Sequence, residues 1–308
     1  MMSTVFATLG ILVLCGIVYR RIPGVPDPLI VRRVIGSIVL NVFVPLLTFG
    51  VVSTTPLSSD LWSVPLVSIT SVVLGFAMSW VVFARLLRSR LATETIGALI
   101  IASTWCNAMY LGLPITTAIV GYHVGHVPIL YDYLGMTPLL FILGTVVAVE
   151  YGRRGEKHTL RAGLMQALQM PPTIAVGLGV LMNVAQIPIA PFILDVCASA
   201  GKTVAPLMLF SIGLALHFPR LSTLPILAPV ALIRCILVPI AVYPFIGAVS
   251  SSHDVARAVV LESAMPTMML TMVFAERYGL DESALAQAIL VTTLVSVATL
   301  PFVAQWPF

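Results

Sequence analysis

Long, uninterrupted runs of apolar residues restrict most strongly what this chain can fold into. Trp62 to Leu87 and Pro225 to Val249 are two such runs, and a helix needs about 20 apolar residues to cross a bilayer. Only 9% of the residues are charged, which leaves too little polar surface for a soluble body of this length. Lipid-exposed backbone must satisfy its own hydrogen bonds, and the runs lack the alternation of barrel strands. The sequence therefore predicts an all-α polytopic membrane protein.

Hydropathy predicts ten membrane-spanning helices, in two sets of five. The first run has no basic n-region and no cleavage motif, so we interpret it as a retained helix and not as a signal peptide. The expected segments are Ser3–Tyr19, Arg33–Val52, Trp62–Leu87, Thr93–Ile119, Leu130–Tyr151, Met170–Ala185, Leu194–Leu216, Pro225–Val249, Val255–Phe274 and Glu282–Phe302.

The basic residues predict the orientation of the chain. Most of them fall in or beside alternate loops, whereas Lys202 and Arg257 alone are assigned to the opposite side and Arg234 lies within a span. The positive-inside rule places the basic loops in the cytoplasm and both termini outside. The basic-loop residues are Arg20, Arg21, Arg32, Arg33, Arg85, Arg88, Arg90, Arg153, Arg154, Lys157, Arg161, Arg220 and Arg277. This distribution accounts for the net charge of +4 without a nucleic-acid partner.

Several short motifs recur at a common spacing of about 160 residues. ALIIAS ending at Ser103 matches AVVLES ending at Ser263, and PLLTF from Pro45 matches PLMLF from Pro206. An odd number of helices per repeat would place the halves in opposite orientations, as in many alternating-access carriers. The expected organisation is a first repeat over 1–152, a cytoplasmic linker over 153–161 and a second repeat over 162–308.

Helix-breaking residues interrupt the fourth segment and its repeat partner, the ninth. Asn107, Gly112 and Pro114 lie within eight residues of one another in the fourth, and Glu262 to Thr267 (ESAMPT) includes Pro266 in the ninth. Paired interrupted helices are the best sequence pointer to a transporter binding site, because the breaks free backbone N–H and C=O groups. The plainer interpretation is that these prolines only kink packed helices. We disfavour it because the two prolines lie in repeat-related segments.

Glu262 and Arg234 are the most informative charged residues, because ionisable groups inside a bilayer are costly and usually functional. Glu262 could bind a cation, carry a proton or pair with a base. A structural Arg234–Glu262 ion pair and a direct ligand role for each remain open alternatives. We expect substrate binding at Asn107, Pro114, Arg234, Pro266 and Thr267, and coupling of an ion at Glu262, Ser103, Asn107, Ser263 and Thr137.

Other reactive residue types point to no further chemistry. The four cysteines lack disulfide or metal spacing and are expected to be small buried hydrophobes. His123 and His126 are too few for a metal site, so no metal is expected. The chain has no HExxH, GxSxG or phosphate-loop motif, which disfavours an intramembrane enzyme or a nucleotide-driven pump. No cofactor is expected beyond a coupling Na⁺ or H⁺.

The motifs resemble those of the auxin efflux carrier family, which includes bacterial malonate and malate carriers and the plant PIN-formed auxin exporters. The N-terminal match runs over NxxxxGxP from Asn107 to Pro114 and over VEYGR from Val149 to Arg153. The C-terminal match includes AMPT from Ala264, VFAERYGLD from Val273 and the Leu300-Pro301 pair. Pro45 also fits the family's second-helix proline.

The resemblance implies a fold and a mechanism that spacing alone does not provide. Helices one, two, six and seven would form a scaffold through which the chain pairs as a homodimer, and helices three to five and eight to ten a mobile transport domain. The fourth and ninth helices would cross at their breaks. Small organic anions would be carried by an elevator-like motion, and the short midpoint linker is similar to that of bacterial members, which implies a bacterial inner membrane.

Two alternatives to an organic-anion carrier follow. The arrangement is also similar to bile-acid sodium symporters, in which a ninth-helix Glu and fourth-helix polar groups bind sodium. Glu262, Ser103 and Asn107 could take those parts in a sodium-coupled symporter of amphipathic anions. From another class, a channel or membrane receptor could retain the fold without alternating access, and saturable counterflow separates a carrier from both.

Overall fold

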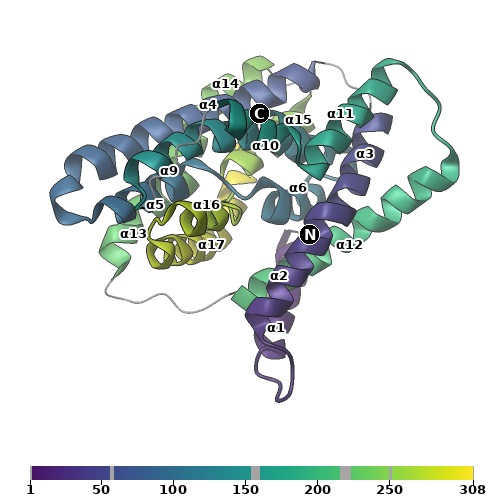
Figure 1. Cartoon of the computed structure of the whole chain (residues 1–308). Helices are drawn as coiled ribbons and strands as arrows, with labels where there is room; N and C mark the ends of the chain where they lie inside the picture. Colours follow the sequence, from purple (N-terminus) through teal and green to yellow (C-terminus); the bar gives the residue numbers. More distant parts are fainter. Residues whose placement is uncertain (1, 56–58, 154–159, 216–222, 250–251, 308) are drawn as a thin grey trace. The chain divides into compact units, whose positions relative to one another are not determined.

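The computed structural model describes residues 2–55, 59–153, 160–215, 223–249 and 252–307 (Figure 1). Regular structure in these ranges is helical, apart from one isolated antiparallel bridge between Cys106 and Thr267. Six helices in the described ranges are long and apolar enough to cross a membrane, and three shorter apolar helices accompany them. The all-α class is therefore confirmed, whereas the count of ten spans and the inverted repeat stay predictions.

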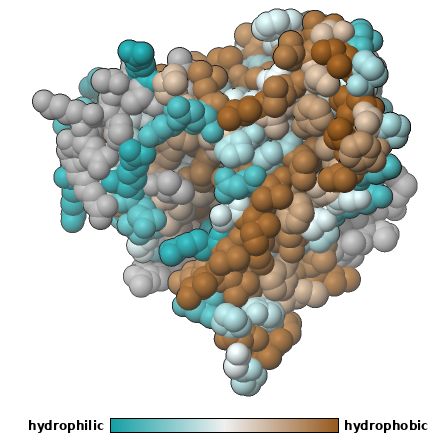
Figure 2. Space-filling view, turned by 45° about the vertical axis from the view of Figure 1, so that its right-hand side comes forward, coloured by the Kyte–Doolittle hydropathy of each residue, from teal (hydrophilic) through white to brown (hydrophobic). Residues whose placement is uncertain are grey.

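Apolar side chains cover much of the outer surface. Ile11, Trp62, Leu181 and Phe302 are among many large hydrophobic residues with more than half of their area exposed. Figure 2 shows that hydrophobic residues make up much of the face drawn. Water would penalise such a surface at about 25 cal/mol per Å², so lipid is its natural solvent.

The chain divides into two compact units. Unit 1 comprises residues 1–58, 109–129 and 169–217, and unit 2 comprises residues 59–108, 130–168 and 218–308. Segments from both halves of the sequence meet within each unit. Arg154, Lys157 and Arg220, which were expected in cytoplasmic loops, lie outside the described residues.

Unit 1 is built on two helix pairs, α1 with α12 and α3 with α11. Asn183 of α11 donates from Nδ2 to the carbonyls of Val52 and Thr55 at the end of α3, at 2.8 and 2.7 Å. A third helix, α2, packs against α12. Asp27 caps α2, and its side chain accepts from the Leu29 N–H at 2.8 Å. The helices of this unit are α1 Met2–Tyr19, α2 Pro28–Ile38, η1 Val39–Phe43, α3 Val44–Thr54, α6 Leu113–Ile119, η5 Tyr122–Val124, α11 Pro171–Val184 and α12 Pro191–Ala215.

Unit 2 surrounds α5 with α4, α9, α13 and α17. Its helices are α4 Asp60–Ser79, η2 Trp80–Leu86, η3 Arg88–Arg90, α5 Thr93–Thr104, η6 Tyr131–Met136, α8 Thr137–Leu139, η7 Leu140–Gly144, α9 Thr145–Tyr151, α10 Leu160–Leu168, α13 Leu224–Leu232, η9 Ile233–Leu237, α14 Val238–Val249, α15 His253–Ser263, α16 Thr271–Tyr278 and α17 Glu282–Val303. The chain passes from one unit to the other within two further helices, the π-helical η4 Ala108–Gly112 and the short α7 His126–Leu130.

Two elements differ from the sequence expectation. A short helix, α10, begins at Leu160, inside the segment expected to be a linker over 153–161. The fifth predicted segment is longer than expected, because apolar helical structure extends from Tyr122 to Tyr151. Both differences arise at the polar or Gly-containing borders of helices, where hydropathy alone places a boundary poorly.

Candidate functional site

Two helices of unit 2 end at buried residues. The first, α5, ends at Thr104, and the second, α15, ends at Ser263. Both final residues are fully buried. Because the last four carbonyls of a helix have no partner within it, two buried helix ends create a demand for hydrogen-bond donors at one place.

The segments that follow the two helices pair with each other as a short antiparallel ladder. The Asn107 N–H donates to the Pro266 carbonyl at 2.7 Å, and the Met268 N–H donates to the Trp105 carbonyl at 2.9 Å. Cys106 and Thr267 form the bridge between these bonds. The interruption that follows α5 and the one that follows α15 therefore lie against each other within unit 2.

Local chemistry explains why each helix stops where it does. Pro266 disfavours helical geometry at Met265 and has no N–H to donate back. On α5, Ser103 and Thr104 donate side-chain hydroxyls to the carbonyls of Leu99 and Ile100, at 2.8 and 2.7 Å. Such bonds to a carbonyl four residues earlier weaken and bend helices. The tertiary ladder then supplies the hydrogen bonds that further helix would have made.

Pro114 lies apart from the break that it was expected to cause. The break spans Trp105 to Asn107, and helical structure resumes at Ala108 and continues to Ile119. Pro114 lies inside this helical stretch in unit 1, at the change from the π-helical turn to α6. The fourth segment is interrupted as predicted, but of the predicted stretch Asn107–Pro114 only Asn107 lies in the break, because the pairing with Pro266 and Met268 sets its position and not Pro114.

Arg234 reaches both helix ends from η9. Its side chain is fully buried. One terminal nitrogen, Nη1, donates to the Thr104 carbonyl at 2.9 Å, and the other, Nη2, donates to the Ser263 carbonyl. The guanidinium therefore contacts the last residue of α5 and the last residue of α15 together.

Thr267 connects the ladder to α5 and to α17. Its hydroxyl donates to the Ala102 carbonyl at 2.7 Å, and its N–H donates to the Thr292 hydroxyl at 3.1 Å. Thr292 also donates to the carbonyl of Ala288 at 2.8 Å. Sequence reasoning included Thr267 and missed Thr292, although a threonine on the same face as Ser296, four residues later, was a usable signal.

The remaining predicted residues of the crossing are buried in unit 2. The Ser263 hydroxyl donates to its own helix at Val260, at 2.7 Å, as Ser103 does to Leu99. Glu262 has no exposed area, and its backbone carbonyl accepts from the Cys106 thiol at 3.3 Å. Cys106 is buried, as predicted, and it also belongs to the ladder.

Thr137 belongs to a separate polar contact on the neighbouring helix. Its hydroxyl donates to the Asp132 carboxylate at 2.6 Å, and both residues are buried. The helical turn between them, η6, contacts the ladder through Met136, whose carbonyl accepts from the Trp105 indole at 3.3 Å. Thr137 therefore lies near the crossing through η6 and Trp105.

A comparison with known proteins connects this geometry to a family. A family model described as a membrane transport protein matches residues 31–304. The chain belongs to the membrane transport protein family. This is the auxin efflux carrier family that the motifs resemble, and its members are transporters and not enzymes.

Two archaeal relatives support membership in the membrane transport protein family. A protein of Methanothermobacter thermautotrophicus, named as an uncharacterized transporter, is 29% identical over 306 residues, which cover 97% of this chain and 96% of the relative. A protein of Methanocaldococcus jannaschii with the same description is 27% identical over 214 residues, covering 68% of this chain and 67% of the relative. The chain is thus a multi-pass membrane transport protein.

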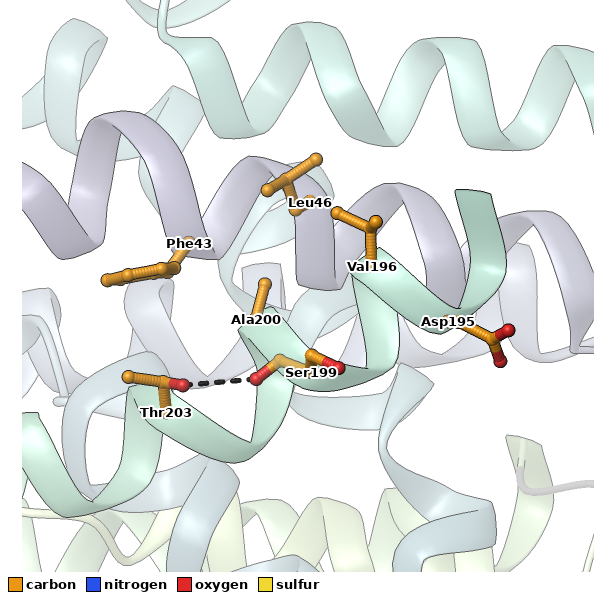
Figure 3. A pocket seen from close by; sticks show the side chains of 7 residues that line it. All are labelled: Phe43, Leu46, Asp195, Val196, Ser199, Ala200 and Thr203. Carbon is orange, nitrogen blue, oxygen red and sulfur yellow. Dashed lines mark hydrogen bonds between the residues drawn. The ribbon is translucent and has the colours of Figure 1, made fainter. Parts of the chain in front are cut away.

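This membrane transport protein also has a groove in unit 1, lined by none of the site residues predicted from the sequence. Its volume is about 400 Å³, and α12 contributes most of its lining (Figure 3). The lining residues are Phe43, Leu46, Asp195, Val196, Ser199, Ala200 and Thr203. The Thr203 hydroxyl donates to the Ser199 carbonyl at 3.0 Å, and the Asp195 carboxylate points away from the other labelled side chains. The lining of this groove includes a carboxylate and no basic side chain, so the groove does not suit an anionic ligand.

Proposed function

We propose that this protein is a secondary active transporter that carries small organic anions across the plasma membrane by alternating access. The observation that carries the proposal is the ladder between Trp105–Asn107 and Pro266–Met268. It joins two interrupted helices whose freed backbone groups and buried hydroxyls can serve a polar solute inside a membrane protein.

An inverted repeat accounts for the way in which the two helices meet. Thr104 and Ser263, the final residues of α5 and α15, are within one residue of the register in which Ser103 matches Ser263. Equivalent positions of two halves would come together in this way if the halves were related by a two-fold axis in the membrane plane. We therefore propose ten spans in two inverted sets of five.

The composition of the two units supports an elevator motion. Unit 1 holds residues 1–58 and 169–217, which we propose as the scaffold and as the contact surface of a homodimer, together with residues 109–129 of the fourth and fifth predicted segments. Unit 2 holds 59–108, 130–168 and 218–308 and contains the whole ladder. We propose unit 2 as the transport domain that moves with its solute.

The chemistry of the interrupted helices favours an anion. Helical structure resumes at Ala108 and at Thr271, and the start of a helix presents free N–H groups and the positive end of its dipole. Asn107, Pro266 and Thr267 come just before these starts, and we propose that they bind a small carboxylate such as malonate or malate, or an auxin-like acid. Glu262, Ser103, Ser263 and Thr137 are proposed to serve coupling.

A ligand screen tests the proposal. Melting temperatures of purified protein are measured with a panel of organic acids, because a ligand at about a hundred times its Kd stabilises the native state by about 2.7 kcal/mol. We expect a carboxylate to raise the melting temperature of the wild type and of Asn41→Ala, whose side chain is exposed. Asn107→Ala should lose the shift, and an equal shift in all three proteins would exclude a site at the ladder.

A further inference from the structure

Arg234 has a position in the crossing that its expected role as an anion ligand does not explain. Both terminal nitrogens of its guanidinium donate to backbone carbonyls, and these carbonyls belong to the last residues of α5 and α15. Two helices that are interrupted in different halves of the sequence therefore share one donor group.

Helix ends need such a donor when they are buried. The carboxyl end of a helix carries free carbonyls and the equivalent of about half a negative charge. At the surface water satisfies these carbonyls, but Thr104 and Ser263 have no exposed area. Two such negative ends in one buried place repel each other. Their partial charges add up to about one negative charge, which a single monovalent cation neutralises.

The neighbouring carbonyls already have other partners. The Ala102 carbonyl accepts from the Thr267 hydroxyl, and the Glu262 carbonyl accepts from the Met265 N–H at 3.2 Å and from the Cys106 thiol. The guanidinium thus reaches the two carbonyls that terminate the helices. Its planar fork of donors suits two acceptors at once, whereas the ammonium of a lysine is a single point charge.

We propose that Arg234 is a positioning residue, a built-in cation that caps the two half-helix ends together and holds the crossing closed. In this role it replaces the water or bound ion that two buried helix ends would otherwise require. Its charge is then committed to the protein and not to the solute. The proposal rests on the contacts within unit 2, and only its consequence for transport rests on the proposed function.

Thermal unfolding of the ligand-free protein tests the proposal first. Arg234→Ala leaves two buried carbonyls without a cation, and we expect its melting temperature to fall by roughly 10 °C. A residue that only binds a substrate would leave this temperature unchanged or raise it. The matched control is Arg257→Ala, because Arg257 also donates to a carbonyl at a helix end, Ala304 at 3.1 Å, but is only half-buried. We expect a shift of at most about 2 °C there.

Chemical rescue then shows whether the stability depends on the hydrogen bonds of the guanidinium group or only on the volume of the side chain. Guanidinium chloride at low millimolar concentration should restore at least half of the loss in Arg234→Ala, whereas equal sodium chloride should restore none. Arg234→Met fills the space without charge, so it should be as unstable as Arg234→Ala and should gain nothing from guanidinium. Recovery with either salt alike, or a stable Arg234→Met, would overturn the proposal.

A milder variant keeps the proposal testable if Arg234→Ala does not fold. Arg234→Lys retains the charge but cannot span both carbonyls, so its melting temperature should lie between those of the wild type and Arg234→Met. A wild-type melting temperature in Arg234→Lys would contradict the shared cap. If guanidinium also restores counterflow in Arg234→Ala, the role of Arg234 extends to transport. If the wild type shows no counterflow, the proposed function is refuted, but the melting temperatures still decide the role of Arg234.

Discussion

Thr267 shows how a single hydroxyl group can fix the crossing of the two helices. Its side chain donates to the Ala102 carbonyl of α5, and its N–H donates to Thr292 of α17. Because all three residues are buried, no water is at hand to replace a lost bond. The free energy of unfolding should therefore depend on this hydroxyl.

Replacement of Thr267 by valine tests that dependence. Thr267→Val keeps the shape of the side chain but leaves the Ala102 carbonyl without its donor, and this should cost about 1–3 kcal/mol. Thr293→Val is the control, because the Thr293 hydroxyl donates to the Ile289 carbonyl inside its own helix. Melting curves in detergent measure both variants, and equal losses would argue against the tertiary bond.

Glu262 allows a test of coupling at the residue scale. If this buried carboxylate binds a coupling cation, transport by the wild type should rise with an imposed sodium gradient, and Glu262→Gln should lose that response because the amide carries no charge. Glu282→Gln, at an exposed position in the first turn of α17, should keep it. Equal sodium dependence in all three proteins would remove Glu262 from the coupling role.

Helix pairs in unit 1 depend on small residues at their contact points. Gly16 of α1 lies against Gly213 of α12, and a Cβ atom at Gly16 would overlap the Phe210 carbonyl. Close approach of backbones at small residues is a main source of helix association in membranes. The pair α1 and α12 should therefore be sensitive to a single methyl group.

Gly16→Ala should destabilise the protein by about 1–3 kcal/mol, as overpacking commonly does. Gly10→Ala lies in the same helix, and nothing is within 4 Å of the added methyl group. That control should be neutral or stabilising by up to about 1 kcal/mol, since alanine is the better helix former. Differential scanning fluorimetry compares the two variants, and matching losses would mean that the Gly16 contact contributes nothing specific.

The sequence predicted the elements of this site better than their internal geometry. Composition alone indicated lipid-embedded helices, and Pro266 marked the break after α15 correctly. The break after α5 was assigned to Asn107–Pro114, but it spans Trp105 to Asn107, where no proline marks it. Its position depends on the ladder with Pro266 and Met268, a contact between residues about 160 apart that no local pattern encodes.

The acceptors of the Arg234 hydrogen bonds were equally hard to predict. An intramembrane arginine indicated function, but its partners are backbone carbonyls of Thr104 and Ser263, which any residue type would offer. Sequence reasoning weighed a side-chain partner, Glu262, because only side chains are visible in a sequence. The fold determines which backbone carbonyls have no partner within their own helix, and residue types alone do not show this.

At the scale of the whole molecule, the distribution of basic residues predicts the orientation in the membrane. Arg153 should face the cytoplasm and Tyr122 the outside, and both side chains are largely exposed, at 74% and 88%. In a Cys15→Ser background, a membrane-impermeant maleimide should label Tyr122→Cys in intact cells and Arg153→Cys only after lysis. The reverse pattern would invert the proposed topology.

The whole chain is proposed to act as a carrier, and counterflow in proteoliposomes tests this most directly. Liposomes are loaded with the carboxylate that raises the melting temperature most, and uptake of the same labelled acid is followed. A carrier predicts a transient accumulation that saturates with external substrate and depends on the internal load. Uptake that is linear in concentration and indifferent to the internal load would indicate a channel and contradict the account, and binding without any uptake would indicate a receptor and contradict it equally.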